Sequence, residues 1–226
     1  MVVFLGKEPG RRVEAYVGEY ASGKSEIAIN RALELKNQGH KVTLVDLDTV
    51  EPFYTLRPIK KALEEEGLNI IAFSRSESFG LGETGAMLNP RARWALLNEG
   101  DIILDIGYGV FGAQMLNLVE GANESPDLQI FAVVNYSRPM TGTRQRIKDY
   151  LEQLGRIDAI VANTHLGDES TWPLVLEGNR EICMAAKEMK IPVAYMMVDE
   201  KLRNTKEEDL YLPVKFLKRY MPSAIW

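Results

Sequence analysis

The sequence has a single cysteine, Cys183, among 226 residues, so it cannot form an internal disulfide. A chain without disulfides suits a reducing compartment, and we expect a cytoplasmic protein. The sequence also lacks a positive balance of charge, because 27 Lys and Arg residues stand against 32 Asp and Glu residues, for a net charge of −5. This balance gives no support for binding to nucleic acid or to an anionic membrane.

Long apolar runs are missing as well. The N-terminal run Val2–Leu5 is too short for a signal peptide, and no segment approaches the ~20 apolar residues that span a membrane. The sequence has no internal repeat and no low-complexity tract. Hydrophobic residues make up 46% of the chain, enough to bury a core, and we expect one domain over residues 1–226.

The most specific pattern present is a glycine loop, Gly18-Glu19-Tyr20-Ala21-Ser22-Gly23-Lys24-Ser25. It follows a short apolar run, Val13–Val17, and opens a helical run, Glu26–Leu35. A strand, a glycine loop and a helix N-terminus in this order form a phosphate cradle, because backbone N–H groups converge there and glycines let the chain come close. We therefore predict that the stretch from Gly18 to Glu26 binds a nucleotide, with Lys24 on the outer phosphates and Ser25 on Mg²⁺.

The rest of the chain alternates strands with helices, which predicts an α/β fold with a doubly wound, mostly parallel sheet and helices on both faces. Apolar runs such as Ile130–Val134 fit strands that are buried on both sides. The segment Ser74–Asn89 is expected to be a functional loop. Besides the first strand and helix, the expected strands are Lys41–Asp46, Leu68–Phe73, Asp101–Asp105, Leu128–Asn135, Asp158–Asn163 and Pro192–Val198, and the expected helices are Pro58–Glu66, Pro90–Asn98, Phe111–Glu120, Thr141–Leu154, Trp172–Lys190 and Glu207–Tyr220.

Carboxylates follow two of the expected strands. Asp46 and Asp48 come at the end of one strand, and Asp105 ends another. Ligands of such sheets gather at the carboxyl ends of the strands, and a carboxylate beside a phosphate loop commonly holds Mg²⁺ or its water shell. We predict that Asp46 and Asp105 serve the metal together with Ser25, and that Asp48 orients an attacking water. A turn or helix-cap role is the alternative for each.

Asn163 ends a strand far along the sheet, where it is positioned to read a nucleotide base. Guanine-specific proteins commonly carry an Asp three residues after such an Asn, and this chain has Leu166 there. The sequence therefore favours adenine, with a turn Asn as the alternative. We also predict that Pro192 contacts the nucleotide, and that His165 packs or caps and does not catalyse.

These motifs together resemble the MinD/ParA/CobQ group of P-loop ATPases, in the SIMIBI class that also holds nitrogenase iron protein and dethiobiotin synthetase. The resemblance covers Val13 to about Val198. It rests on the glycine loop, on Asp46-Leu47-Asp48, on Leu104-Asp105-Ile106-Gly107 and on Asn163. Three longer segments resemble a little-characterised bacterial branch of the group: Val45-Asp46-Leu47-Asp48-Thr49-Val50-Glu51-Pro52, Val134-Asn135-Tyr136-Ser137-Arg138-Pro139 and Asn163-Thr164-His165-Leu166-Gly167.

The resemblance implies the P-loop NTPase fold, ATP and Mg²⁺ as ligands, and the roles given above for Lys24, Ser25, Asp48 and Asn163. It also allows a homodimer. One departure matters: the group has a second lysine where this chain has Glu19, and that lysine reaches the partner's phosphates across a dimer. Because Glu19 has the wrong charge for an anion, slow or effector-dependent hydrolysis is expected.

Three functions remain open at this point. The first is an ATPase that acts as a molecular switch or as a factor that loads a protein partner. The second is an ATP-dependent kinase or ligase of the dethiobiotin synthetase type, in which Arg57 and the loop Ser74–Asn89 face a small-molecule substrate. The third is a nucleotide-binding module without turnover.

Overall fold

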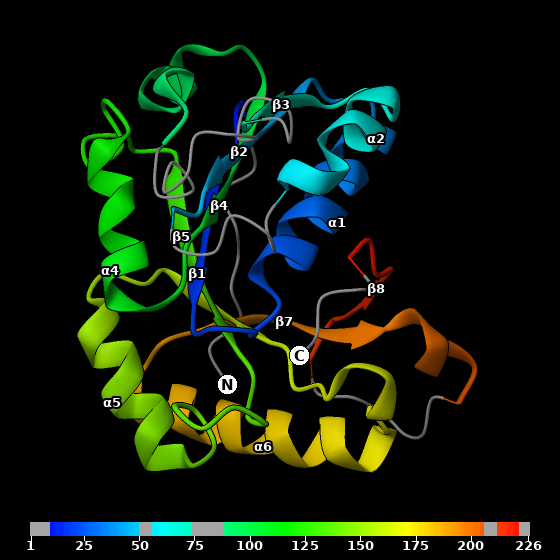
Figure 1. Ribbon diagram of the computed structural model, residues 1–226. Helices are drawn as coiled ribbons and strands as arrows, with labels where there is room; N and C mark the ends of the chain where they lie inside the picture. The colour runs from blue at the N-terminus through cyan, green and yellow to red at the C-terminus, as the bar shows by residue number, and fades with distance from the viewer. Residues whose placement is uncertain (1–9, 50–55, 74–87, 206–211, 222–226) are drawn as a thin grey trace.

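A computed structural model describes residues 10–49, 56–73, 88–205 and 212–221, and only these are discussed below. Its main feature is a sheet of eight strands in the order β3-β2-β4-β1-β5-β6-β7-β8 (Figure 1). All of these strands run parallel to their neighbours. The strand that leads into the glycine loop, β1, lies in the middle of the sheet, so the loop emerges at its centre.

The strands are β1 (Val13–Gly18), β2 (Val42–Leu47), β3 (Asn69–Ile71), β4 (Asp101–Ile106), β5 (Leu128–Val134), β6 (Ala159–Ala162), β7 (Val193–Asp199) and β8 (Val214–Leu217). The α-helices are α1 (Lys24–Asn37), α2 (Lys60–Glu65), α4 (Gly109–Gln114), α5 (Arg144–Leu154) and α6 (Trp172–Met189). Short 3-10 segments are η1 (Arg57–Ile59), η3 (Pro90–Leu97), η4 (Met115–Leu118), η5 (Gly167–Glu169) and η6 (Glu200–Thr205).

Helices cover both faces of the sheet (Figure 1). On one face, apolar residues of α1 and α2 such as Ile27 and Leu63 join a core cluster with the strands. On the other face, residues of α4, α5 and α6 such as Ala113, Ile147 and Ile182 pack against a second cluster. The predicted doubly wound α/β fold is confirmed, and every parallel strand directs its carboxyl end to the same edge.

Most predicted elements are present with shifted ends, and one prediction is wrong. The stretch Glu207–Tyr220 was expected to form a helix, but Val214–Leu217 is a strand that pairs with β7. Pro213 precedes this strand, and a proline inside a helix removes a hydrogen bond and clashes with the preceding turn. The expected helices Pro90–Asn98 and Phe111–Glu120 are instead a 3-10 segment and a short α-helix followed by one.

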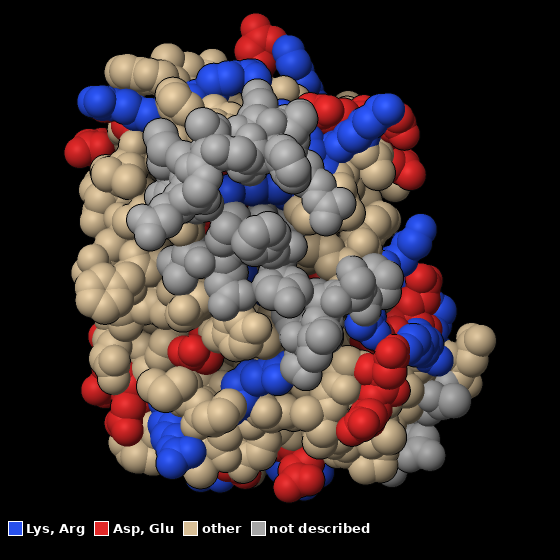
Figure 2. Space-filling view, viewed as in Figure 1, with Lys and Arg blue, Asp and Glu red and all other residues tan. Residues whose placement is uncertain are grey.

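The expected functional loop Ser74–Asn89 lies outside the described residues except for its last two. No helix of the described chain is long and apolar enough to cross a membrane. Figure 2 shows Lys and Arg side chains interspersed with Asp and Glu on the viewed face, without an extended area of one sign among the described residues.

A buried ion pair explains why the central strand carries a glutamate. Glu14 on β1 is buried and faces α1, where Arg31 donates from Nε at 2.9 Å and from Nη2 at 2.8 Å to its two carboxylate oxygens. The hydroxyl of Tyr16, on the same face of the strand, donates to Glu14 at 2.8 Å. This network fixes α1 against the sheet, and α1 carries the end of the glycine loop.

We expect Arg31→Met to destabilise the fold by about 3 kcal/mol, because it leaves the Glu14 carboxylate buried without its cation. The free energy of unfolding from urea titration would measure this. Lys41→Met is the matched control, since Lys41 pairs with Glu99 at the surface, where such pairs contribute little. Equal stability of the two variants would show that the buried pair does not hold α1.

Candidate functional site

The phosphate loop, residues 19–23, joins β1 to α1 at the carboxyl edge of the sheet. Gly18 permits the turn out of β1, because a Cβ there would lie 2.5 Å from the carbonyl oxygen of Val133. Ala21 and Gly23 have φ values of 52° and 93°, in the left-handed region that glycine tolerates best. No side chain caps the N-terminus of α1, so its first N–H groups can bind an anion.

Two carbonyl groups of this loop are held by side chains from other parts of the sheet. Arg138, after β5, donates from Nε to the oxygen of Ala21 at 3.0 Å. Asn163, after β6, donates from Nδ2 to the oxygen of Ser22 at 2.7 Å. The C=O and N–H groups of a trans peptide point in opposite directions, so the N–H group of Gly23 faces away from Asn163. Backbone N–H groups of such a loop are the donors that a phosphate needs.

The two supporting segments are themselves joined by Asn135, which is fully buried. Its side chain donates to the carbonyl oxygen of His165 at 3.1 Å and accepts the N–H group of His165 at 3.2 Å. Its carbonyl oxygen accepts the N–H group of Arg138 at 3.1 Å. Burial, together with the charges of Arg138 and Arg219, lowers the pKa of His165 to about 4, so the ring is neutral at pH 7 and packs against the loop.

The lysine of the loop lies over its backbone. Lys24 is buried and donates from Nζ to the carbonyl oxygen of Glu19 at 2.9 Å. Glu19 is half-buried, and Tyr20 is 42% exposed, with its ring edge-to-face against Tyr108 at 5.5 Å between centroids. The Lys24 side chain therefore lies against the start of the loop, where its Nζ contacts the Glu19 backbone.

The two metal-site carboxylates predicted from the strand ends lie side by side. Asp46 on β2 and Asp105 on β4 are partners in the strand register, and both are buried. Burial raises the pKa of Asp46 to about 6, although Arg57 and the N–H group of Asp48 oppose the shift. Asp46 accepts a hydrogen bond from that N–H group at 3.0 Å and one from Arg57 Nε at 3.4 Å.

Asp105 has a different environment from Asp46. In the described part of the chain, neither of its carboxylate oxygens accepts a hydrogen bond of normal length and angle. Burial, followed by the charge of Asp46, raises its pKa well above the ordinary value, while the Ser25 hydroxyl lowers it. A buried carboxylate without a partner, next to a hydroxyl at a helix N-terminus, fits a bound cation.

The protein supplies only part of a metal site. No group of three or more His, Cys, Asp or Glu residues in the described chain could hold a metal ion. Mg²⁺ characteristically keeps several waters and is bound through one or two carboxylates plus substrate phosphates. Ser25 and Asp105 are therefore suited to Mg²⁺ that arrives with a phosphorylated ligand.

Asp48 lies at the same edge, one step beyond Asp46. It is 9% exposed, and its Oδ1 lies 3.1 Å from the position that a Cβ on Gly107 would take, directly after β4. Arg57 donates from Nη2 to the backbone oxygen of Asp48 at 3.3 Å. Arg57, which the kinase hypothesis assigned to a substrate, is thus buried and holds the end of β2.

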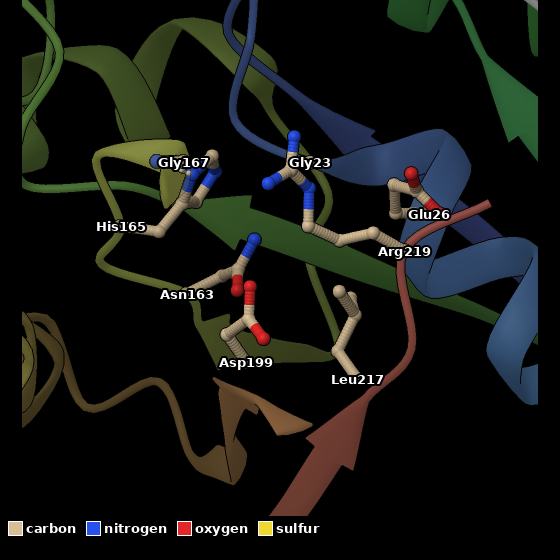
Figure 3. Close-up of a pocket in the computed structure, with 8 residues that line it drawn as sticks. All are labelled: Gly23, Glu26, Asn163, His165, Gly167, Asp199, Leu217 and Arg219. Atoms are coloured by element: carbon tan, nitrogen blue, oxygen red, sulfur yellow. Dashed lines mark hydrogen bonds between the residues drawn. The ribbon is translucent and has the colours of Figure 1, made fainter. Parts of the chain in front are cut away.

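A pocket opens on the side of the phosphate loop that faces β6, β7 and β8, away from Asp46 and Asp105 (Figure 3). Its walls come from the start of α1, from the segment after β6, from the end of β7 and from β8 with the residues that follow it. Figure 3 shows the side-chain oxygen of Asn163 and the carboxylate of Asp199 on the same side of this pocket. The lining residues are Gly23, Glu26, Asn163, His165, Gly167, Asp199, Leu217 and Arg219.

Two of the predicted nucleotide residues have other positions or contacts than expected. Pro192 precedes the first residue of β7 and so lies at the amino edge of the sheet, opposite the phosphate loop. The prediction that it contacts the nucleotide is not supported, because the pocket receives Asp199 from the other end of the same strand. Glu26 does line the pocket, but its carboxylate accepts the backbone N–H groups of Tyr220 and Met221.

Sequence reasoning missed Arg138, Asp199 and Arg219. Asp199 ends an apolar strand, which is the signal that identified Asp46 and Asp105, so it could have been found. Arg138 and Arg219 carry no local signal. Arg138 reaches a carbonyl 117 residues away in the sequence, a contact that only the folded sheet creates.

No protein-family model matches the chain, and no curated protein matches its sequence. Solved structures do match its fold. The cell division protein FtsY of Thermotoga maritima has a TM-score of 0.59 at 17% identity, over 97% of this chain and 68% of that one. The signal recognition particle receptor FtsY of Elizabethkingia anophelis, in complex with GDP, has a TM-score of 0.56 at 16% identity, over 88% and 61%.

The 54 kDa signal recognition particle protein of Aeropyrum pernix, also in complex with GDP, has a TM-score of 0.55 at 20% identity. The match covers 84% of this chain but 42% of that one. These proteins belong to the SIMIBI class of P-loop NTPases, and at such low identity the likeness shows the fold alone. The chain thus shares the α/β, P-loop NTPase-like fold of these structures, and the MinD/ParA branch is not confirmed.

Proposed function

We propose that this protein binds ATP with Mg²⁺ and hydrolyses it as a molecular switch or partner-loading factor of the MinD/ParA type. The phosphate loop carries the proposal: its carbonyl groups are held from outside, the N-terminus of α1 is uncapped, and the unpartnered Asp105 lies beside Ser25. A phosphate cradle next to a site suited to Mg²⁺ is what a nucleoside triphosphate requires.

The position of each residue suggests its role. Lys24 would bind the outer phosphates, and Ser25 and Asp105 would hold Mg²⁺, which neutralises phosphate charge when bound. Asp46 already has Arg57 as its partner, so we assign it to the water shell of the metal. Asp48 remains to orient the attacking water.

We infer that the base is adenine. Asn163 uses its Nδ2 on the phosphate loop, which leaves its side-chain oxygen as an acceptor beside the Asp199 carboxylate. Adenine carries an amino group at the position where guanine carries a carbonyl oxygen, so adenine can donate to the Asn163 oxygen and guanine cannot. The Asp199 carboxylate does not separate the two bases, because it can also accept the N1–H and amino groups of guanine. Leu166, in place of an acidic residue, supports the same choice. GTP is the alternative, because two of the structural neighbours are complexes with GDP.

A switch is favoured over a kinase or ligase because Arg57 is already engaged by Asp46 and by the backbone of Asp48. A protein partner suits a switch, and the neighbours from the signal recognition particle and its receptor fit this view. A homodimer and the lack of nucleic-acid binding stay predictions. With Glu19 in the loop, hydrolysis is expected to be slow until a partner is present.

Calorimetric titration with Mg-ATP tests the proposal. Lys24→Ala should weaken binding roughly 10- to 100-fold, since hydrogen bonds to a charged group contribute about 1.5–3 kcal/mol. Lys36→Ala, at the other end of the same helix, is the control and should bind normally. Unchanged affinity in Lys24→Ala would rule out the phosphate loop as the site.

Mg-GTP should bind at least tenfold more weakly than Mg-ATP in the same titration. The reverse order of affinities would mean that the pocket binds guanine.

Asp48→Asn separates chemistry from binding. The substitution keeps the shape and removes the charge, so ATP affinity should stay near normal while turnover falls roughly 10²-fold, the usual scale for a positioned acid or base. Steady-state release of ADP measures turnover, and Asp149→Asn on the exposed face of α5 is the control. If Asp48→Asn hydrolyses ATP as fast as the wild type, Asp48 is only a turn residue. If the variant loses both ATP binding and its dependence on Mg²⁺, Asp48 is a metal ligand.

A further inference from the structure

The residues that follow β8, Lys218–Met221, form a strap along α1. Asn30 of α1 donates from Nδ2 to the carbonyl oxygen of Lys218 at 2.8 Å and accepts the N–H group of the same residue at 3.0 Å. The Glu26 carboxylate accepts the backbone N–H groups of the last two strap residues at 2.8 to 3.0 Å. The strap backbone is therefore fixed to the helix that begins at the phosphate loop.

Arg219 is the strap residue that lines the pocket, and its side chain extends across it (Figure 3). Its Nη1 donates to Oδ1 of Asp168 at 2.6 Å. Asp168 belongs to η5, in the segment after β6, and it follows Gly167, which lines the pocket. The pair therefore joins the strap to the segment after β6. The Arg219 side chain is 14% exposed, whereas that of Asp168 is 74% exposed.

With Arg219 in this position the pocket has a cavity volume of about 30 Å³, enough for one or two water molecules. A purine ring is much larger. Because the strap backbone is held by Asn30 and Glu26, the Arg219 side chain is the part of this wall that can swing away. Asp168 also accepts a hydrogen bond from Lys201, so opening the pair does not leave the Asp168 carboxylate without a cation.

We propose that Arg219 is a gate on the pocket, closed by its pair with Asp168, and that the purine base of a nucleotide enters only after this pair opens. The gate rests on the proposed function, because it assigns the base to this pocket. The closed and base-bound states exclude each other, so the closed pair lowers the fraction of molecules that can bind. Apparent affinity and association rate fall by that same fraction, while the dissociation rate does not change.

Stopped-flow measurements with ATP labelled by a fluorophore on the ribose test the gate. Arg219→Gln and Asp168→Asn should each raise the association rate constant about two- to fivefold, the range expected for a largely exposed ion pair. The dissociation rate constant should stay at the wild-type value. The double variant should gain no more than either single one, because both remove the same interaction.

Two matched controls account for the change in charge. Lys201→Gln removes the other cation on Asp168, and Glu169→Gln removes the neighbouring anion; neither residue lines the pocket, so neither should speed association. Mg-tripolyphosphate, which has no base, should bind the gate variants and the wild type equally.

The outcomes distinguish the gate from the site itself. If both gate variants still bind the nucleotide and their association rate constants equal that of the wild type, the gate is overturned, while the proposed function is not. Faster dissociation and weaker affinity in Arg219→Gln would also overturn it, because Arg219 would then contact the bound base. If the wild type binds no nucleotide and no tripolyphosphate, the proposed function fails and the gate fails with it.

Discussion

The site depends on hydrogen bonds that hold the phosphate loop by its carbonyl groups. Arg138 and Asn163 bind two neighbouring carbonyl oxygens, and Asn135 ties their segments together. A loop of this shape carries strain, since Ala21 has a positive φ. The supporting side chains fix the orientation of the two peptides before any ligand binds. The N–H group of Ser22 donates to the Glu19 carbonyl oxygen at 3.2 Å, so the N–H group of Gly23 is the donor that Asn163 orients for a phosphate.

Charge explains the other half of the site. Asp46 and Asp105 are adjacent, buried acids at the edge where a polyanion would bind. Arg57 donates to Asp46, whereas the groups that oppose the raised pKa of Asp105 are the Ser25 hydroxyl and the charge of Lys24. Two acids and a triphosphate would repel one another, and a divalent cation held by Ser25 and Asp105 would offset that repulsion. Binding of the metal and binding of the nucleotide should therefore depend on each other.

Sequence patterns predicted the fold and the loop because both follow from local rules. Continuous apolar runs identify strands that are buried on both faces, and the glycine spacing identifies the phosphate loop. The pattern failed at Val214–Leu217, because the predicted helix Glu207–Tyr220 ran through Pro213, whereas the structure has a strand after this proline. That error concealed the strap and Arg219.

The rest of the site arises from contacts between distant segments. Asn163 was predicted at the nucleotide because it ends a strand, but its bond to Ser22 spans 141 residues of sequence. Pro192 was predicted to contact the nucleotide, but it precedes β7 and so lies at the amino edge of the sheet, away from the phosphate loop. A local sequence pattern cannot predict a hydrogen-bond partner that becomes a neighbour only through the order of the strands in the sheet.

The affinity of Asn163→Ala for Mg-tripolyphosphate tests the central claim most directly, because this ligand has phosphates and no base. If Asn163 holds the loop, the variant should bind Mg-tripolyphosphate and Mg-ATP about tenfold more weakly than wild type, in keeping with the loss of one hydrogen bond of roughly 1–1.5 kcal/mol. If ATP binding weakens while tripolyphosphate binding is unchanged, Asn163 only reads the base, and the phosphate loop keeps its shape without it.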